Sequence, residues 1–296
     1  MIALLLALSG AHAQDLDSVD SVDSVSTVET TKRSDKPHLY VRELVAVAGQ
    51  PGGAITEVLV EGRAPVMRYG DPISNMTFIG GGARLAVSPA HIDMAVRSTF
   101  QLIDILPITV ELVHTRYFDG PFAPLGYEEY RSIKAKERDP LYAAGLGFGT
   151  GAVTAIVNPT LQIKLGQLVG FSSWTLSWVA IKQPAGVDTP LIFEPARNMV
   201  IGWNDRLLEH TSAALWEPLD GVGQPLVRVG AALRGNGSSV SPDHTLMLGA
   251  IGMWKPGVKP GVPTFMVLVA PYLKDLDFMG PIPYTAFVST WEMPGA

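Results

Sequence analysis

The chain has 296 residues and contains no cysteine, which excludes a disulfide framework, a thiolate metal site and a cysteine-linked lipid anchor. Charge is also scarce, since only 17% of the residues are charged while 47% are hydrophobic. This balance is apolar for a water-soluble protein of this size. The formal charge is −6, and no basic run is present. Because phosphate binding needs clustered lysine and arginine, we expect no nucleic-acid partner.

Long hydrophobic runs are missing as well, so the sequence predicts no membrane-spanning helix. The first segment, MIALLLALSGAHA, is apolar but far shorter than the roughly 20 residues that cross a bilayer. Small Ala11 and Ala13 follow its apolar core, so we predict that residues 1–13 are a secretory signal peptide. Residues 14–36 hold a short acidic Asp-Ser-Val repeat without aromatic residues, which predicts a disordered leader. Residues 37–296 then form one domain.

Signals for catalysis are few. The six histidines do not stand at the i, i+2 or i, i+4 spacings that build metal sites, and the sequence has neither a G-x-S-x-G elbow nor a P-loop. Two pairings of a histidine with hydroxyl side chains stay open: His244 with Ser238, Ser239 or Ser241, and His114 with Thr115. The segment RGNGSSVSPDH is explained more simply as a polar hairpin loop. We therefore expect no enzyme, no metal and no cofactor.

Strand-like segments of about ten residues fill the chain from Pro37 onward, separated by Gly, Pro, Asn and Asp clusters. Thirteen candidates can be counted, beginning at Leu39, Ile55, Met76, His91, Ile108, Leu141, Thr160, Trp174, Thr211, Leu226, His244, Thr264 and Pro283. A closed single-chain bacterial barrel uses an even number of strands. One candidate is therefore outside the wall or wrongly split, and we predict about twelve strands, with ten or fourteen as alternatives.

One region is ambiguous and one is rich in glycine. The segment PARNMVIGWNDRLLEH, residues 195–210, fits a short helix and a strand through residues 198–203 about equally. In FIGGGARL, the glycine run indicates tight backbone packing or a bend in a strand.

The stretch HIDMAVRSTFQLID, residues 91–104, alternates between apolar and polar side chains. Side chains that point to one face of such a strand are apolar, namely Ile92, Met94, Val96, Phe100 and Leu102. Those that point to the other face are polar, namely His91, Asp93, Arg97, Thr99 and Gln101. An extended chain sends successive side chains to opposite faces of its sheet. In a soluble sandwich the apolar row would be core, whereas in a membrane barrel it would face lipid and the polar row would face inward.

Strand length and composition favour the membrane barrel. About ten residues at roughly 3.3 Å rise, tilted near 40°, cover about 25 Å, the height of an outer-membrane apolar band. The polar parities of TLQIKLGQLVGF and LVRVGAALRG carry small residues and isolated charges, which suit a concave lumen. The predicted lumen-lining residues are Asp93, Arg97, Gln101, Glu111, Lys164, Arg228 and Arg234.

Aromatic residues tend to stand near the predicted strand ends, which favours an interfacial girdle. They are Tyr40, Tyr69, Tyr117, Phe118, Tyr142, Phe171, Trp174, Trp203, Trp216, Trp254, Tyr272, Tyr284 and Trp291. The longest predicted loop, Phe118–Pro140, is dense in charge and is expected outside the cell. It would fold inward as a constriction, bind a partner outside, or simply be solvated.

With these features the chain resembles the bacterial outer-membrane β-barrel superfamily. Two phrases, LIFEPARNMVIGWND and PTLQIKLG, are similar to those of an uncharacterised group of Gram-negative barrels. The resemblance implies a closed antiparallel up-and-down transmembrane β-barrel, with outer-membrane lipid and the barrel-assembly machinery as partners. Barrels of this class usually end on an aromatic residue that this machinery reads, whereas here Trp291 stands five residues from the end.

The sequence thus predicts an exported, all-β outer-membrane barrel with a passive small-solute channel or a structural role. At about twelve strands the bore would be narrow, which favours small solutes over a general porin. Two alternatives stay open: a soluble secreted or periplasmic β-barrel or sandwich that binds an apolar ligand, and an outer-membrane hydrolase.

Overall fold

A computed structural model describes residues 37–49, 52–66, 77–101, 103, 105–120, 122–127, 147–194, 197, 199–218, 226–241, 244–257, 262–274 and 283–294. The predicted signal peptide and leader lie outside these residues and stay predictions. Within the described ranges, no helix has the length and apolar character needed to cross a membrane.

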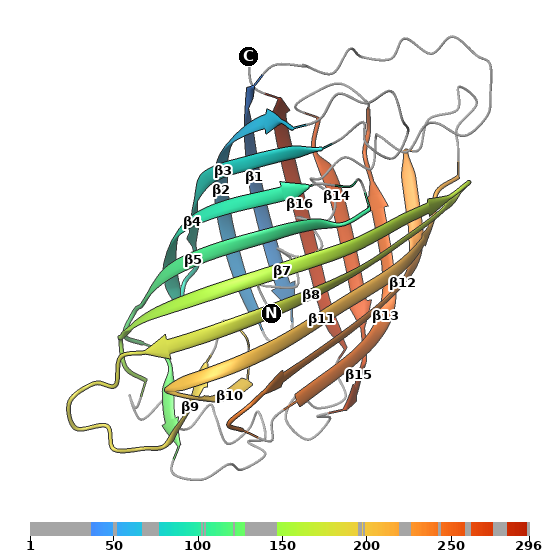
Figure 1. Ribbon diagram of the computed structural model, residues 1–296. Helices are drawn as coiled ribbons and strands as arrows, with labels where there is room; N and C mark the ends of the chain where they lie inside the picture. Colours follow the sequence, from blue (N-terminus) through green and yellow to red (C-terminus); the bar gives the residue numbers. More distant parts are fainter. Residues whose placement is uncertain are drawn as a thin grey trace, which may run out of the picture.

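Twelve antiparallel strands close into a barrel (Figure 1), as the sequence predicted. Pairing runs in chain order around the wall, and the first and last strands close it. The wall strands are β1 (His38–Gly49), β2 (Gly52–Pro65), β3 (Phe78–Val87), β4 (His91–Gln101), β5 (Pro107–Tyr117), β7 (Gly151–Leu165), β8 (Leu168–Ile181), β11 (Asn204–Trp216), β12 (Val227–Ser238), β13 (His244–Trp254), β14 (Thr264–Ala270) and β16 (Tyr284–Pro294). The short β15 (Tyr272–Lys274) continues beyond β14 and also pairs with β13.

The sequence yields thirteen candidate strands and not twelve because its pattern divides one hairpin, β7 and β8, into three segments. Strand β7 runs through Asn158 and Pro159, which the sequence suggested as a break. The chain reverses instead at Gly166, where φ is 60° and a glycine is favoured. The segment predicted as one strand from Thr160 to Phe171 therefore belongs to two strands, and three candidates become β7 and β8.

Strand β4 has the two faces that its alternation predicted. His91, Thr99 and Gln101 are buried on the inner face, whereas Met94 and Val96 are exposed on the outer face. Leu102, the last member of the apolar row, lies outside the described residues.

The same arrangement recurs around the barrel. Exposed large apolar side chains point outward from its strands, among them Val47, Val58, Leu85, Val96 (62% exposed), Leu112, Leu176, Leu248 and Val267. A soluble barrel or sandwich would bury this row in its core and would not present it continuously outward. The soluble alternative therefore does not fit, and hydrocarbon is the medium that this surface matches.

A second, three-stranded sheet lies against the inside of the wall near one end of the barrel, in the order β10-β9-β6 (Figure 1). It consists of β6 (Leu125–Tyr127), β9 (Leu191–Glu194) and β10 (Met199–Gly202), and we call it the plug sheet. Every residue of β9 and β10 is buried. Residues 195–210 thus contain β10 and the start of β11, so the helix prediction is wrong and the strand alternative is confirmed.

The plug sheet packs against opposite sides of the bore. Ile192, Met199 and Ile201 cluster with inner residues of β5, β7, β8 and β11. Leu191 and Phe193 belong to a cluster that includes residues of β1, β14 and β16. We call this end of the barrel the plug end, and the end with the β7–β8 turn the turn end. The predicted loop from Phe118 contributes β6 to the plug sheet, while residues 128–140 lie outside the described part.

The predicted aromatic girdle is only partly present. Phe118, Trp174, Trp216 and Trp254 are exposed on the outside, and Trp254 stacks on Phe265 at 5.5 Å. For another group the prediction is wrong, because these rings are buried inside the barrel: Tyr40, Tyr117, Phe171, Trp203, Tyr272 and Tyr284. Such rings fill the bore and the plug rather than contact headgroups. Tyr69 and Tyr142 lie outside the described residues.

Candidate lumen site

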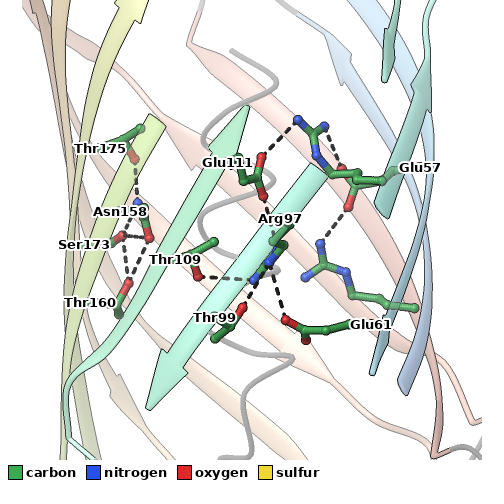
Figure 2. A network of polar contacts seen from close by, with 12 residues as sticks. Glu57, Glu61, Arg97, Thr99, Thr109, Glu111, Asn158, Thr160, Ser173 and Thr175 are labelled. Carbon is green, nitrogen blue, oxygen red and sulfur yellow. Dashed lines mark hydrogen bonds and ion pairs between the residues drawn. The ribbon is translucent and has the colours of Figure 1, made fainter. Parts of the chain in front are cut away.

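A row of ion pairs crosses the inner face of five neighbouring strands, β1 to β5 (Figure 2). Its seven members alternate in sign, and we call them the charge ladder: Arg42, Glu57, Arg84, Glu111, Arg97, Glu61 and Arg63. The nitrogen–oxygen distances between successive members are 2.6, 3.3, 3.2, 3.4, 4.0 and 2.8 Å. Buried charges need such pairing, because each one alone would carry a large desolvation cost.

Small residues let two charged side chains of the ladder contact each other across an intervening strand that has no charged residue between them. Gly82 of β3 stands between Glu61 and Arg97 in the register, and the missing side chain lets these two reach each other. A Cβ on Gly80 would approach Glu61 Oε1 to 2.6 Å. The glycine run of FIGGGARL therefore makes room for Glu61, which refines the expectation of tight packing.

Arg63, at the end of the ladder, is held by two aromatic faces. Its guanidinium lies 3.7 Å from the ring centre of Tyr40 and 4.7 Å from that of Phe78. Cation–π contacts of this kind hold an arginine in place and leave its charge intact.

A neutral polar cluster continues the inner face beyond the ladder (Figure 2). Asn158 Nδ2 donates to Thr175 Oγ1 at 2.6 Å and to Ser173 Oγ at 3.0 Å, while Thr160 Oγ1 donates to Ser173 Oγ at 3.0 Å. These groups satisfy one another on β7 and β8 next to Pro159, which has no backbone N–H to donate.

Four charged residues and one tyrosine tie the plug sheet to the wall. Tyr117 of β5 donates to Glu194 Oε1 at 2.5 Å, and Arg197 lies 3.4 Å from Glu194 and 3.7 Å from Glu209 of β11. Glu209 also pairs with Arg234 of β12 at 2.9 Å. Burial acts to lower the pKa of Arg197, but the carboxylates of Glu194 and Glu209 raise that pKa above its ordinary value. Arg197 therefore stays charged and holds the sheet in place.

A third charged group lies towards the turn end. The Glu217 carboxylate forms one ion pair with Arg228 at 2.6 Å and another with Lys164 at 3.2 Å. One carboxylate thus links β12 and β7 across the inner face.

The structure places all seven predicted lumen residues on the inner face, but in separate groups. Arg97 and Glu111 belong to the ladder, Lys164 and Arg228 share Glu217, and Arg234 reaches the plug through Glu209. Asp93 accepts a hydrogen bond from Thr115 at 2.7 Å, and Gln101 is buried near the turn end of β4.

Sequence reasoning missed much of the ladder. It did not name Arg42, Glu57, Glu61, Arg63 or Arg84, although each stands on the inward parity of its strand. Glu194 and Arg197 of the plug, and their partner Glu209 on wall strand β11, were also missed, because they lie in or beside residues 195–210, which the sequence left ambiguous between helix and strand.

His114 does not face Thr115, and two of the three serines suggested as partners of His244 are bound to another residue. His114 and Thr115 are successive residues of β5, so they lie on opposite faces, and Thr115 bonds Asp93 inside. Ser238 and Ser239 donate to Asp205 at 2.5 and 2.9 Å, which fixes them in a turn rather than frees them for attack. Among the described residues, no three acidic or histidine side chains form a group that could hold a metal ion.

A hydroxyl and imidazole cluster that the sequence did not suggest lies on the outer face. His210 Nε2 is 2.8 Å from Ser212 Oγ and 3.1 Å from Ser172 Oγ, and Trp174 stacks on the imidazole at 5.3 Å. The three polar groups satisfy one another halfway along β11, where an outward side chain meets hydrocarbon. Mutual hydrogen bonding lowers the cost of placing them there.

No protein-family model matches the chain, and no curated protein does. Solved structures do match. The β domain of the Bordetella autotransporter BrkA has a TM-score of 0.50 at 9% identity, covering 87% of this chain and 99% of that one. The KdgM porin has a TM-score of 0.38 at 7% identity, and the match covers 85% of this chain and 98% of the porin. The outer-membrane channel DcaP of Acinetobacter baumannii has a TM-score of 0.34 at 9% identity, and the match covers 87% of this chain and 96% of DcaP. This chain is thus similar in fold to bacterial outer-membrane β-barrels.

Proposed function

We propose that this protein is an exported outer-membrane β-barrel that conducts small solutes through a narrow bore, with the plug sheet as its constriction. The outward apolar surface suits outer-membrane lipid, and the barrel-assembly machinery is the expected partner during insertion. Inner charges supported by fixed partners would screen solutes by charge and size.

One observation carries the proposal: the plug sheet is a separate sheet. Strands β6, β9 and β10 form their ladder with one another, not with the wall. Side-chain packing and the pairs through Glu194, Arg197 and Glu209 attach it. A sheet attached in this way can shift without breaking the barrel's own backbone hydrogen bonds, as a constriction or gate requires.

Loop length supports an orientation. The two longest stretches between wall strands, from β5 to β7 and from β8 to β11, both leave and rejoin the wall at the plug end, and both contribute strands to the plug sheet. Outer-membrane barrels carry their long loops outside and their short turns in the periplasm. The plug sheet would therefore restrict the bore from its extracellular mouth.

Conductance of the refolded protein in planar bilayers tests the proposal. We expect small, discrete conductance steps from the natural chain. Replacing Glu194→Gln and Arg197→Gln together should loosen the plug sheet and raise the open-channel current several-fold. The matched control, Lys164→Gln with Glu217→Gln, removes a buried pair at the other end and should leave gating by the plug unchanged.

Absence of conductance from all three proteins would remove the channel function and leave a structural role.

We assign no catalysis to the outer-face cluster of Ser172, His210 and Ser212, because hydrolysis needs water and this position faces hydrocarbon. Ester hydrolysis by the purified barrel that disappears in Ser212→Ala would contradict that assignment.

A further inference from the structure

One carboxylate lies on the lipid-facing side of the barrel. Glu43, near the middle of β1, is exposed and shares the outward parity of Leu39 and Val47. Its neighbours in the chain, Arg42 and Leu44, are buried on the inner face. Among the described residues of the wall strands, no other acidic side chain has the outward parity. The apolar surface of the barrel therefore carries one carboxylate at mid-strand.

The described part of the chain offers no partner for Glu43. Its cross-strand neighbours are Val58 of β2 and Trp291 of β16, and neither carries a positive charge. Within the described residues its carboxylate makes no hydrogen bond and no ion pair. A charged group in the apolar part of a membrane is costly, and such groups normally pair or mark a functional contact. The partner of Glu43 must therefore come from outside this chain.

The outer-face cluster of Ser172, His210 and Ser212 offers a suitable group. Both hydroxyl contacts of the imidazole use Nε2, and Nδ1 has no hydrogen-bond partner in the described residues. When a hydroxyl donates to Nε2, the neutral imidazole carries its proton on Nδ1. A donor without an acceptor then lies on the lipid-facing side, which is the complement of the Glu43 carboxylate.

The two groups lie on opposite sides of the ring. In the order of the twelve wall strands, β8 is six positions from β1, and β11 is next to β8. Figure 1 accordingly shows β8 and β11 in front and β1 behind. Glu43 and His210 each lie near the middle of their strands, so both lie near the middle of the wall. They cannot meet within one barrel, but they can meet between two barrels that have the same orientation in the membrane.

The surroundings of the cluster leave room for a second barrel. Gly170 and Ala214 are paired on the outer face, next in parity to Ser172 and Ser212. Small residues let transmembrane segments approach each other closely. The longer side chain of Glu43 could therefore reach the imidazole of a neighbouring copy without a bulky side chain in the way.

We propose that copies of this barrel associate side by side in the membrane, with Glu43 of one copy accepting a hydrogen bond from His210 of the next. The acceptor and the donor lie on opposite sides of each barrel, so the contact is heterologous and does not close on itself. The copies therefore form open rows and not a closed dimer or trimer. The contact leaves the bore and the plug sheet unobstructed, so it goes beyond the proposed channel function.

Counting photobleaching steps of singly labelled barrels in supported bilayers tests the proposal. The full mature chain, labelled at its N-terminus, should form species of two, three and more copies as its surface density rises. Glu43→Gln and His210→Ala should each weaken association about tenfold, the effect of losing one charge-assisted hydrogen bond. The control, Ser98→Ala, removes a hydroxyl from the outer face of β4, three strands from β1, and should not change association.

A mixture of the two variants gives the sharpest comparison. Glu43→Gln keeps the donor side and His210→Ala keeps the acceptor side, so unlike copies restore one contact. The mixture should therefore form dimers, whereas each variant alone should stay monomeric at the same density. Species longer than dimers should be missing, because they need both sides intact on one copy.

A natural chain that stays monomeric at every density overturns the proposal. Variants that assemble as well as the natural chain also overturn it, as does a mixture that assembles no better than its parts. Heat-modifiable migration on gels shows that each variant is folded. Conductance is measured on single barrels, so its presence or absence is independent of these outcomes.

Discussion

At the scale of single residues, Arg97 is the most informative position. It pairs with Glu111 at 3.4 Å and with Glu61 at 4.0 Å, and both carboxylates keep another arginine, Arg84 or Arg63. Removing Arg97 therefore leaves the ladder partly paired while lowering the charge of the bore by one unit.

We expect Arg97→Ala to shift the reversal potential in a salt gradient towards cation preference, since a positive charge is lost from the path. Glu61→Gln should shift it the opposite way, because a negative charge is lost. Reversal potentials measured in a potassium chloride gradient check both. Identical values for the two variants and the natural chain would mean that ions do not pass the ladder.

Residue roles could be predicted only where the alternation was clean. Arg97 and Glu111 stand in strands with regular periods, so their inward direction followed from parity. Arg42 and Arg84 stand in equally regular strands, but only the register shows that they reach Glu57 from both sides. A single sequence carries no information on register between strands, so the ladder as a connected object could not be predicted.

At the scale of elements, strand β3 shows how packing limits substitution. Gly81 points outward with no atom near a would-be Cβ, whereas a Cβ on Gly82 would collide with the carbonyl oxygen of Val60 and lie 2.7 Å from Glu61 Cα. The two glycines are neighbours in the same strand, which makes them a matched pair.

We expect Gly82→Ala to destabilise the barrel by about 1–3 kcal/mol, the usual cost of inserting a methyl group where there is no space. Gly81→Ala should change stability by no more than about 0.5 kcal/mol. Urea titration of the refolded proteins, followed by tryptophan fluorescence, compares them. Equal midpoints for both variants would show that β2 and β3 are not packed as closely as described.

Turns and inserted segments were harder to predict than strands. Asn158 and Pro159 form a typical turn signal, yet β7 continues through them because Asn158 bonds Ser173 and Thr175 across the pair. A strand through residues 198–203 was one of two predicted alternatives, but the plug sheet as an assembled unit was missed, because β9 and β10 are buried on both sides and have no alternation to detect.

At the scale of the whole molecule, the fold class could be predicted by comparing the lengths of the strands with those of strands in ordinary globular sheets. Strands of 10 to 15 residues are common here, for example in β3 and β7, and such strands suit a membrane-spanning wall better than an ordinary globular sheet. Closure of the ring depends on β1 pairing with β16, residues some 250 positions apart, and no local pattern contains that contact.

The central claim is that the apolar side of each wall strand touches lipid. Because the natural chain lacks cysteine, single cysteines at neighbouring positions of β4 can be labelled without ambiguity. Val96 is 62% exposed on the outer face, and Ala95 is buried on the inner face. A fluorophore on Val96→Cys in bilayers containing brominated lipid should be strongly quenched, whereas one on Ala95→Cys should not. Quenching at Ala95→Cys that equals or exceeds that at Val96→Cys would contradict the account.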